Sequence, residues 1–219
     1  MKQYVRYFRW IFIITGAFAI IYAGLNLLHG LRTFPERTNE ECLTQQRVFD
    51  YGDVLSAEEE KKLAGLIAKR EKQTGCDIVL VTLNESLKEY ARGKEPYVPY
   101  EEFVRVYAED FYDSNAFGYN GPIGDGVVLV DNWYREEDGR VYTWLAAIGR
   151  AEKKYTAARI NHLLDNVYRY VERDPYRAYK AYINEFYHDM AGGGVFTFYL
   201  PYWLPLAAAA LVMDLFVMV

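Results

Sequence analysis

Residues 47–83 read RVFDYGDVLSAEEEKKLAGLIAKREKQTGCDIVLVTL and predict a strand, an acidic turn, a helix and a second strand. Ser56 is followed three residues later by Glu59, which is the pattern of a capping box at the start of a helix. Gly75 is a typical helix stop, and residues 76–83 after it are nearly all apolar or β-branched. Such a run predicts a central strand covered on both faces, so the stretch predicts one βαβ unit.

The chain beyond this unit continues to alternate between strand and helix patterns. After a polar loop that contains Gly93, Pro96 and Pro99, apolar side chains recur at helical spacing in some segments and as short β-rich runs in others. The predicted helices cover residues 100–112 and 152–173 and begin again at Pro175, and the predicted strands of a hairpin cover residues 127–130 and 141–148. We therefore expect an α/β fold, a three-layer α/β/α sandwich with a mixed sheet.

Two apolar segments lie at the ends of the chain. Residues 10–28 carry no formal charge and are long enough to cross the roughly 30 Å hydrocarbon core as a helix. Lys2, Arg6 and Arg9 precede this segment, so the positive-inside rule places the N-terminus in the cytoplasm. Residues 196–219 are a second transmembrane candidate with clustered aromatic residues at one end. The alternatives are a cleaved signal peptide for the first segment and a buried helix for the second.

These segments predict three parts of a two-pass protein of the cell membrane. Residues 1–29 form the cytoplasmic N-terminus and first span, residues 30–195 an extracytoplasmic domain, and residues 196–219 a second span. The sequence stops inside that second segment, so we expect a truncated span and leave open whether a cytoplasmic tail follows Val219. The chain of 219 residues is 52% hydrophobic and has a net charge of −5. Because the two apolar segments are predicted to span a membrane, we expect the bilayer and a membrane protein as partners. No segment concentrates Lys and Arg, so we expect no nucleic acid as a partner.

The two cysteines, Cys42 and Cys76, both fall in the part assigned to an oxidising compartment. A disulfide between them would contribute about 3–4 kcal/mol on the chain-entropy model. Two free thiols are the alternative, and the sequence leaves both open.

Three short motifs in order give the domain a family resemblance. VFD at 48–50 with LS at 55–56 resembles an opening V-x-D-x-x-x-x-L-S, and TGCDIV at 74–79 resembles a TG-x-x-I-x-V strand entry. GDGVVLV at 124–130 resembles D-N-G-V-L-L-L-V. Over residues 47–187 the chain thus resembles the TPM domain family. Its members are described both as calcium-binding, phosphatase-like domains and as accessory factors of membrane complexes, and the resemblance implies one of these two roles.

The acidic turn after the first strand is a candidate cation site. Asp50 and Asp53 lie at the carboxyl end of a strand, where open α/β sheets bind ligands, and carboxylates suit Ca²⁺ and Mg²⁺. The resemblance favours Asp125 as a third ligand, whereas a parallel sheet would place Asp131 at that edge, and we rank Asp125 first. The predicted metal site is Asp50, Asp53 and Asp125, with Ca²⁺ as the expected ion and Mg²⁺ as the alternative. The competing interpretation is local turn chemistry beside a helix N-terminus.

The functional expectation is a membrane-tethered, extracytoplasmic TPM-like module that binds a divalent cation and assists or regulates a membrane-protein complex. The sequence contains no HExxH, GxSxG or P-loop pattern, so catalytic residues and any small-molecule substrate are left unknown. One alternative is a metal-dependent phosphatase acting on phosphomonoesters, in which the three aspartates hold the ion and a bound water attacks phosphorus. A purely structural scaffold is the other alternative.

Overall fold

The computed structural model describes residues 15–18, 21–22, 24, 34 and 36–191. The predicted second span, residues 196–219, lies outside the described residues, and so does most of the predicted first span, residues 10–28. Among the residues that are described, no helix combines the length and the apolar character needed to cross a bilayer. The chain divides into two compact units, and the unit Thr33–Met190 carries the features that follow.

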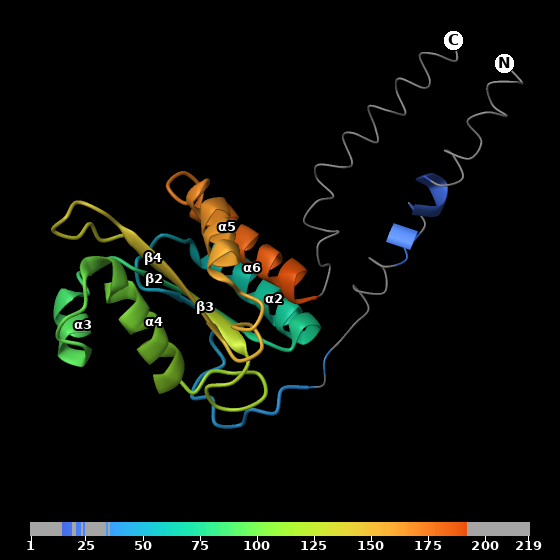
Figure 1. Cartoon of the computed structure of the whole chain (residues 1–219), viewed down its shortest axis with the longest axis horizontal. Coiled ribbons are helices and arrows are strands. Elements are labelled where there is room, and N and C mark those ends of the chain that lie inside the picture. The colour runs from blue at the N-terminus through green and yellow to red at the C-terminus, as the bar shows by residue number, and fades with distance from the viewer. Residues whose placement is uncertain (1–14, 19–20, 23, 25–33, 35, 192–219) are drawn as a thin grey trace, which may run out of the picture. The chain divides into compact units, whose positions relative to one another are not determined.

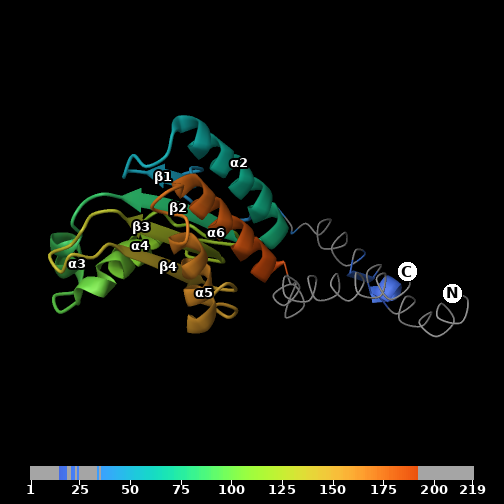
Figure 2. The same cartoon turned by 90° about the horizontal axis from the view of Figure 1, so that it is seen from above.

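A four-stranded mixed sheet forms the centre of this unit (Figure 1), and its spatial order β1-β2-β3-β4 is also the order along the chain (Figure 2). The strands are β1 (Val48–Asp50), β2 (Asp77–Leu83), β3 (Gly126–Asn132) and β4 (Tyr142–Ile148). The pairs β1–β2 and β2–β3 are parallel, whereas β4 returns antiparallel to β3. Every residue of β2 and β3 is buried, as their continuous apolar runs predict, and the predicted mixed sheet is confirmed.

Helices cover both faces of the sheet and make three layers (Figure 2). On one face lie α2 (Ala57–Thr74), α5 (Ala157–Tyr168) and α6 (Pro175–Met190). On the other face lie α3 (Lys88–Lys94), the 3-10 turn η1 (Tyr100–Glu102) and α4 (Phe103–Ser114). Successive side chains of a strand point to opposite faces, so each central strand supplies apolar side chains to two separate cores.

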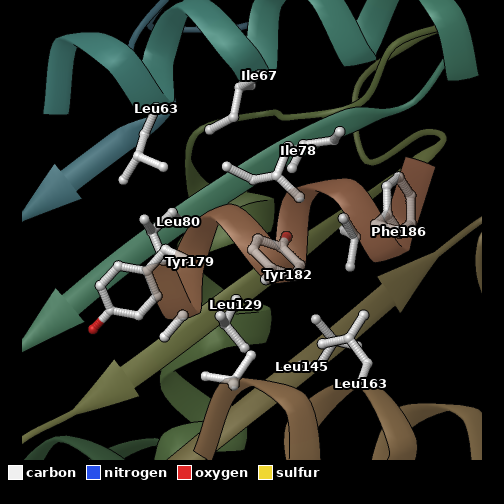
Figure 3. Close-up of a cluster of buried hydrophobic side chains, with 14 of the residues drawn as sticks. Leu63, Ile67, Ile78, Leu80, Leu129, Leu145, Leu163, Tyr179, Tyr182 and Phe186 are labelled. Carbon is white, nitrogen blue, oxygen red and sulfur yellow. The ribbon is translucent and has the colours of Figure 1, made fainter. Parts of the chain in front are cut away.

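The core beneath α2, α5 and α6 is the larger one (Figure 3). Leu80 and Leu129 of neighbouring strands lie in register under Tyr182 of α6, which has no exposed surface. The Tyr182 hydroxyl donates a hydrogen bond of 3.1 Å to the backbone carbonyl of Val79. This pairing satisfies the one polar group that the ring brings into the core.

The boundaries of α2 follow the predicted signals. The Glu59 backbone N–H donates to Ser56 Oγ at 3.4 Å, and the Ser56 backbone N–H donates to Glu59 Oε2 at 2.9 Å, so both halves of the capping box form. Gly75 ends the helix in the left-handed region, with φ of 62°. A Cβ atom added at Gly75 would lie 2.7 Å from the ring of Phe34, so glycine is required for packing as well as for conformation.

Two helix predictions need correction. The stretch predicted as a polar loop contains α3, and the backbone N–H of Leu87, the residue before this helix, donates to Oε1 of buried Glu136 at 3.2 Å. Leu87 is the N-cap residue of α3 and its side chain makes no capping hydrogen bond, so the local sequence carries no N-cap signal for this helix. The helix predicted over 152–173 is shorter, because α5 spans only Ala157–Tyr168 and turns precede it.

Candidate functional site

A row of polar side chains crosses the sheet where the parallel strands end. Asp50 pairs in register with Thr82, Thr82 with Asp131, and Asp131 with Thr143. Residues in register share a face, so all four side chains lie on the face covered by α2, α5 and α6. This carboxyl edge is where open α/β sheets bind ligands, and it is the candidate site.

Asp50 organises the turn between β1 and α2. Its carboxylate accepts hydrogen bonds from the backbone N–H groups of Val54 at 3.2 Å and Leu55 at 2.8 Å, and from the hydroxyl of Thr82. The Gly52 backbone N–H in turn donates to the Thr82 hydroxyl oxygen at 3.1 Å. Asp50 therefore performs the turn chemistry that was the competing interpretation of its role.

Asp53 lies in the same turn, but its carboxylate, unlike that of Asp50, is exposed and makes no hydrogen bond to a described residue. Its backbone lies in the left-handed region, with φ of 51°, and its side chain is exposed. Within the described part of the chain, the Asp53 carboxylate forms no ion pair or hydrogen bond. It is therefore the carboxylate of this turn whose oxygens are open to an external ligand.

Asp131 lies at the same edge as Asp50 but is buried, with 5% of its surface exposed. Thr143 donates a hydroxyl hydrogen bond of 2.6 Å to Asp131 Oδ1, and Tyr179 donates one of 2.7 Å to Oδ2. The indole N–H of Trp133 donates to the Tyr179 hydroxyl at 3.2 Å. Burial among these neutral groups raises the pKa of Asp131, and the hydrogen bonds from Thr143 and Tyr179 oppose that rise only in part.

The variant Asp131→Asn is expected to reduce the pH dependence of the free energy of unfolding. Because the folded-state pKa is raised, the stabilisation by protonated Asp131 is complete below its unfolded pKa of about 3.9 and is lost as pH rises through the folded value. The side chain that replaces Asp131 in the variant cannot titrate. The free energy of unfolding, measured by urea titration from about pH 4 upward, should therefore fall less steeply with pH than in the parent. Burial also raises the pKa of Glu71, so some slope should persist. An unchanged slope would contradict the assignment.

Asp125 lies at the opposite edge of the sheet, which is a correction to its predicted grouping with Asp50. It precedes β3, and its carbonyl accepts the backbone N–H of Asp77, the first residue of β2, at 3.0 Å. The length of β3 separates it from the carboxyl edge by roughly 20 Å. Its carboxylate accepts the Arg150 backbone N–H at 2.8 Å and lies 3.2 Å from Arg150 Nε. Because β1, β2 and β3 run parallel, Asp131 and not Asp125 lies at the same edge of the sheet as Asp50, as the parallel-sheet argument predicted.

The three predicted ligands do not fit one metal site. Six to eight oxygen ligands surround one Ca²⁺ ion. Asp125 lies far from Asp50 and Asp53, and its charge is already neutralised by Arg150. Over residues 36–191 and the few described positions before them, no three His, Cys, Asp or Glu side chains are grouped to hold a metal ion. The structure brings together only Asp50 and Asp53, so any cation there would need carbonyl and water oxygens as well.

The structure also reveals a buried charge network that the sequence patterns did not predict. It lies at the amino edge of the sheet, around Asp77, which accepts hydrogen bonds from the Arg37 guanidinium and from the Gly118 backbone N–H at 2.9 Å. Arg47 Nε donates to Glu71 Oε1 at 2.8 Å, and Arg47 Nη2 lies 3.5 Å from Asp77 Oδ2. The available signal was the placement of charged residues at the ends of apolar strands, where each needs a partner.

The two cysteines are free thiols in the structure. Cys42 donates to the carbonyl of Thr44 at 3.1 Å, and buried Cys76 receives a contact of 3.4 Å from Arg150 Nη2. Burial raises the pKa of Cys76 to about 11, so this thiol stays protonated and unreactive at neutral pH.

Comparison with known proteins gives a family match. The family model of the TPM domain matches residues 48–188, which is more than half of the chain. Among solved structures, the N-terminal domain of the cg2496 protein from Corynebacterium glutamicum is similar at 14% identity and a TM-score of 0.44, covering 76% of this chain and 93% of that domain. No curated protein matches. The chain therefore belongs to the TPM domain family.

Proposed function

We propose that this chain is an extracytoplasmic TPM module, tethered to the cell membrane, that assists or regulates a membrane-protein complex and binds a divalent cation at its carboxyl edge. The observation that carries the cation role is the turn after β1, where the exposed Asp53 carboxylate lies beside Asp50. Ca²⁺ is favoured over Mg²⁺, because flexible coordination by carboxylate, carbonyl and water oxygens suits an exposed turn.

Asp50 and Asp53 have different roles in this proposal. The carboxylate of Asp50 already accepts three hydrogen bonds, so it keeps the turn closed and adds negative charge near the ion. Asp53 supplies free carboxylate oxygens from the exposed part of the turn. Asp125 has no part in this site, because Arg150 holds it at the other edge.

The placement of the aspartates also bears on the phosphatase alternative. That mechanism would need Asp50, Asp53 and Asp125 around one ion with an activated water, and the sheet separates the third carboxylate from the other two. A module that binds a cation and a protein partner requires only the turn and an accessible surface. We therefore favour the binding module over the enzyme.

The variant Asp53→Asn is expected to abolish stabilisation of the full-length protein by Ca²⁺ while changing the unfolding temperature without Ca²⁺ only slightly. Its side chain is exposed, so the fold does not depend on it. Thermal unfolding with and without millimolar CaCl₂ measures both quantities, because a ligand that binds only the native state raises the unfolding temperature.

Two controls make this result specific. Glu58→Gln removes an exposed carboxylate from the first turn of α2, and it should leave the Ca²⁺-dependent shift intact. Repeating the titration with MgCl₂ ranks the two cations. A Ca²⁺-dependent shift that survives in Asp53→Asn would remove Asp53 from the site, and the absence of any shift in the parent protein would favour the structural scaffold.

A further inference from the structure

One edge of the sheet is open along a full-length strand. β4 ends the strand order, so among the described residues only β3 pairs with it. In an antiparallel pair, alternate residues point their backbone N–H and C=O groups toward the neighbouring strand and the others point away. β4 therefore presents a row of backbone donors and acceptors that no described strand pairs with, although at its end the Ile148 carbonyl accepts the Ala151 backbone N–H at 3.2 Å. Such a row is the template that an added strand uses.

A groove follows this open edge between two helices. Its volume is about 430 Å³, and its floor is the stretch from Trp144 to Ile148. α4 supplies one wall, through Glu109 and Asp113, while the other wall carries Glu152, Tyr155 and Ile160. In Figure 1, α4 and α5 lie on opposite sides of β4, which is why the groove runs along the strand edge.

The walls give the groove a negative charge. Three acidic residues line it, and no Lys, Arg or His does so within the described chain. Glu109 pairs with Arg105 at 2.8 Å, whereas Asp113 and Glu152 form no ion pair with any described residue. Burial and the neighbouring charge of Asp110 raise the pKa of Asp113.

We propose that the β4 groove binds an extended, basic segment of a partner protein as a fifth strand of the sheet. Glu109 and Asp113 are one helical turn apart, about 6 Å along the axis of α4, and alternate residues of a strand are about 6.8 Å apart. Lys or Arg at two alternate positions of the incoming strand would therefore face Glu109 and Asp113. The intervening positions would face Tyr155 and Ile160, so apolar residues fit there.

A second copy of this chain fits the groove less well than such a partner. Pairing β4 with β4 would bring the acidic walls of two grooves together, and like charges placed opposite one another in a sheet are destabilising. This inference specifies the partner role proposed above, and it does not depend on the cation at the β1 turn, which lies at the other end of the strand order.

The test uses a fluorescent seven-residue peptide of alternating Lys and Val, titrated with the full-length protein and followed by anisotropy. We expect saturable binding that weakens with added salt, and no binding of the matching Glu and Val peptide. The double variant Glu109→Gln/Asp113→Asn should weaken binding about fivefold or more. Its matched control is Glu58→Gln/Glu60→Gln, which removes the same charge from α2, beside β1, and should bind as the parent does.

Backbone methylation of the peptide separates strand addition from simple charge attraction. Methyl groups on one set of alternate backbone nitrogens should abolish binding, and methyl groups on the other set should leave it intact, because only one set faces β4. Equal binding by both methylated peptides, or equal loss in the control variant, would overturn the proposal. A third outcome would also overturn it: the peptide does not bind, and sedimentation shows self-association of the protein that the double variant Glu109→Gln/Asp113→Asn strengthens. Ca²⁺-dependent stabilisation would survive any of these failures, so the two proposals fail separately.

Discussion

Asp77→Ala is expected to lower the free energy of unfolding by about 3–5 kcal/mol, the range for breaking a buried charge network by removing one partner. Asp77 has no exposed surface and accepts hydrogen bonds from Arg37 and from the Gly118 backbone N–H. Without it, Arg37 loses the carboxylate that it pairs with, and among the described residues Arg47 keeps only Glu71 as an ion-pair partner.

Equilibrium urea unfolding of the full-length protein, followed by far-UV circular dichroism, measures this loss. The matched control is Asp53→Asn, which removes an exposed charge but keeps a residue type that tolerates the left-handed backbone of this position, and it should change stability by less than about 0.5 kcal/mol. A loss below about 1 kcal/mol in Asp77→Ala would mean that the network contributes no more than a surface ion pair.

Tyr182→Ala is expected to cost about 3–5 kcal/mol, because truncating a large buried ring leaves a cavity that neighbouring side chains fill only in part. Tyr182 lies over Leu80 and Leu129 in the centre of the larger core (Figure 3). Tyr182→Phe keeps the ring and removes only the hydroxyl bonded to the Val79 carbonyl, so it should cost about 1 kcal/mol.

The same urea titration ranks these variants. Tyr97→Ala is the matched control, because Tyr97 is 98% exposed and its loss should change the free energy of unfolding only slightly. If Tyr182→Phe proved as damaging as Tyr182→Ala, the hydrogen bond to Val79 would outweigh the packing of the ring, contrary to the expectation.

The sequence predicts those parts of the fold that local patterns control. The capping box at Ser56 and the stop at Gly75 define α2, and the apolar run after Gly75 defines β2. α3 escapes such prediction because its N-cap residue, Leu87, has no capping side chain and is held by Glu136 from the loop between β3 and β4. Local propensity carries no information about a partner that tertiary structure supplies.

The candidate site was predictable only as far as strand directions were known. Asp50 and Asp53 follow β1 directly, so their shared edge was readable from the sequence. Asp125 and Asp131 bracket one strand, and only the direction of β3 decides which of them lies near Asp50. Short motifs give residue types and order, but the end of the sheet that a residue occupies depends on parallel or antiparallel pairing.

The sequential strand order has a consequence for the way the domain is assembled. Each strand pairs with the strand before it in the chain, so the sheet can grow in the order in which the chain is synthesised. α6, the last of these elements to be made, covers Leu80 and Leu129. A nascent chain that ends before Pro175 therefore leaves exposed the part of the apolar sheet face that lies beneath α6, and this surface is protected against aggregation only when α6 is made.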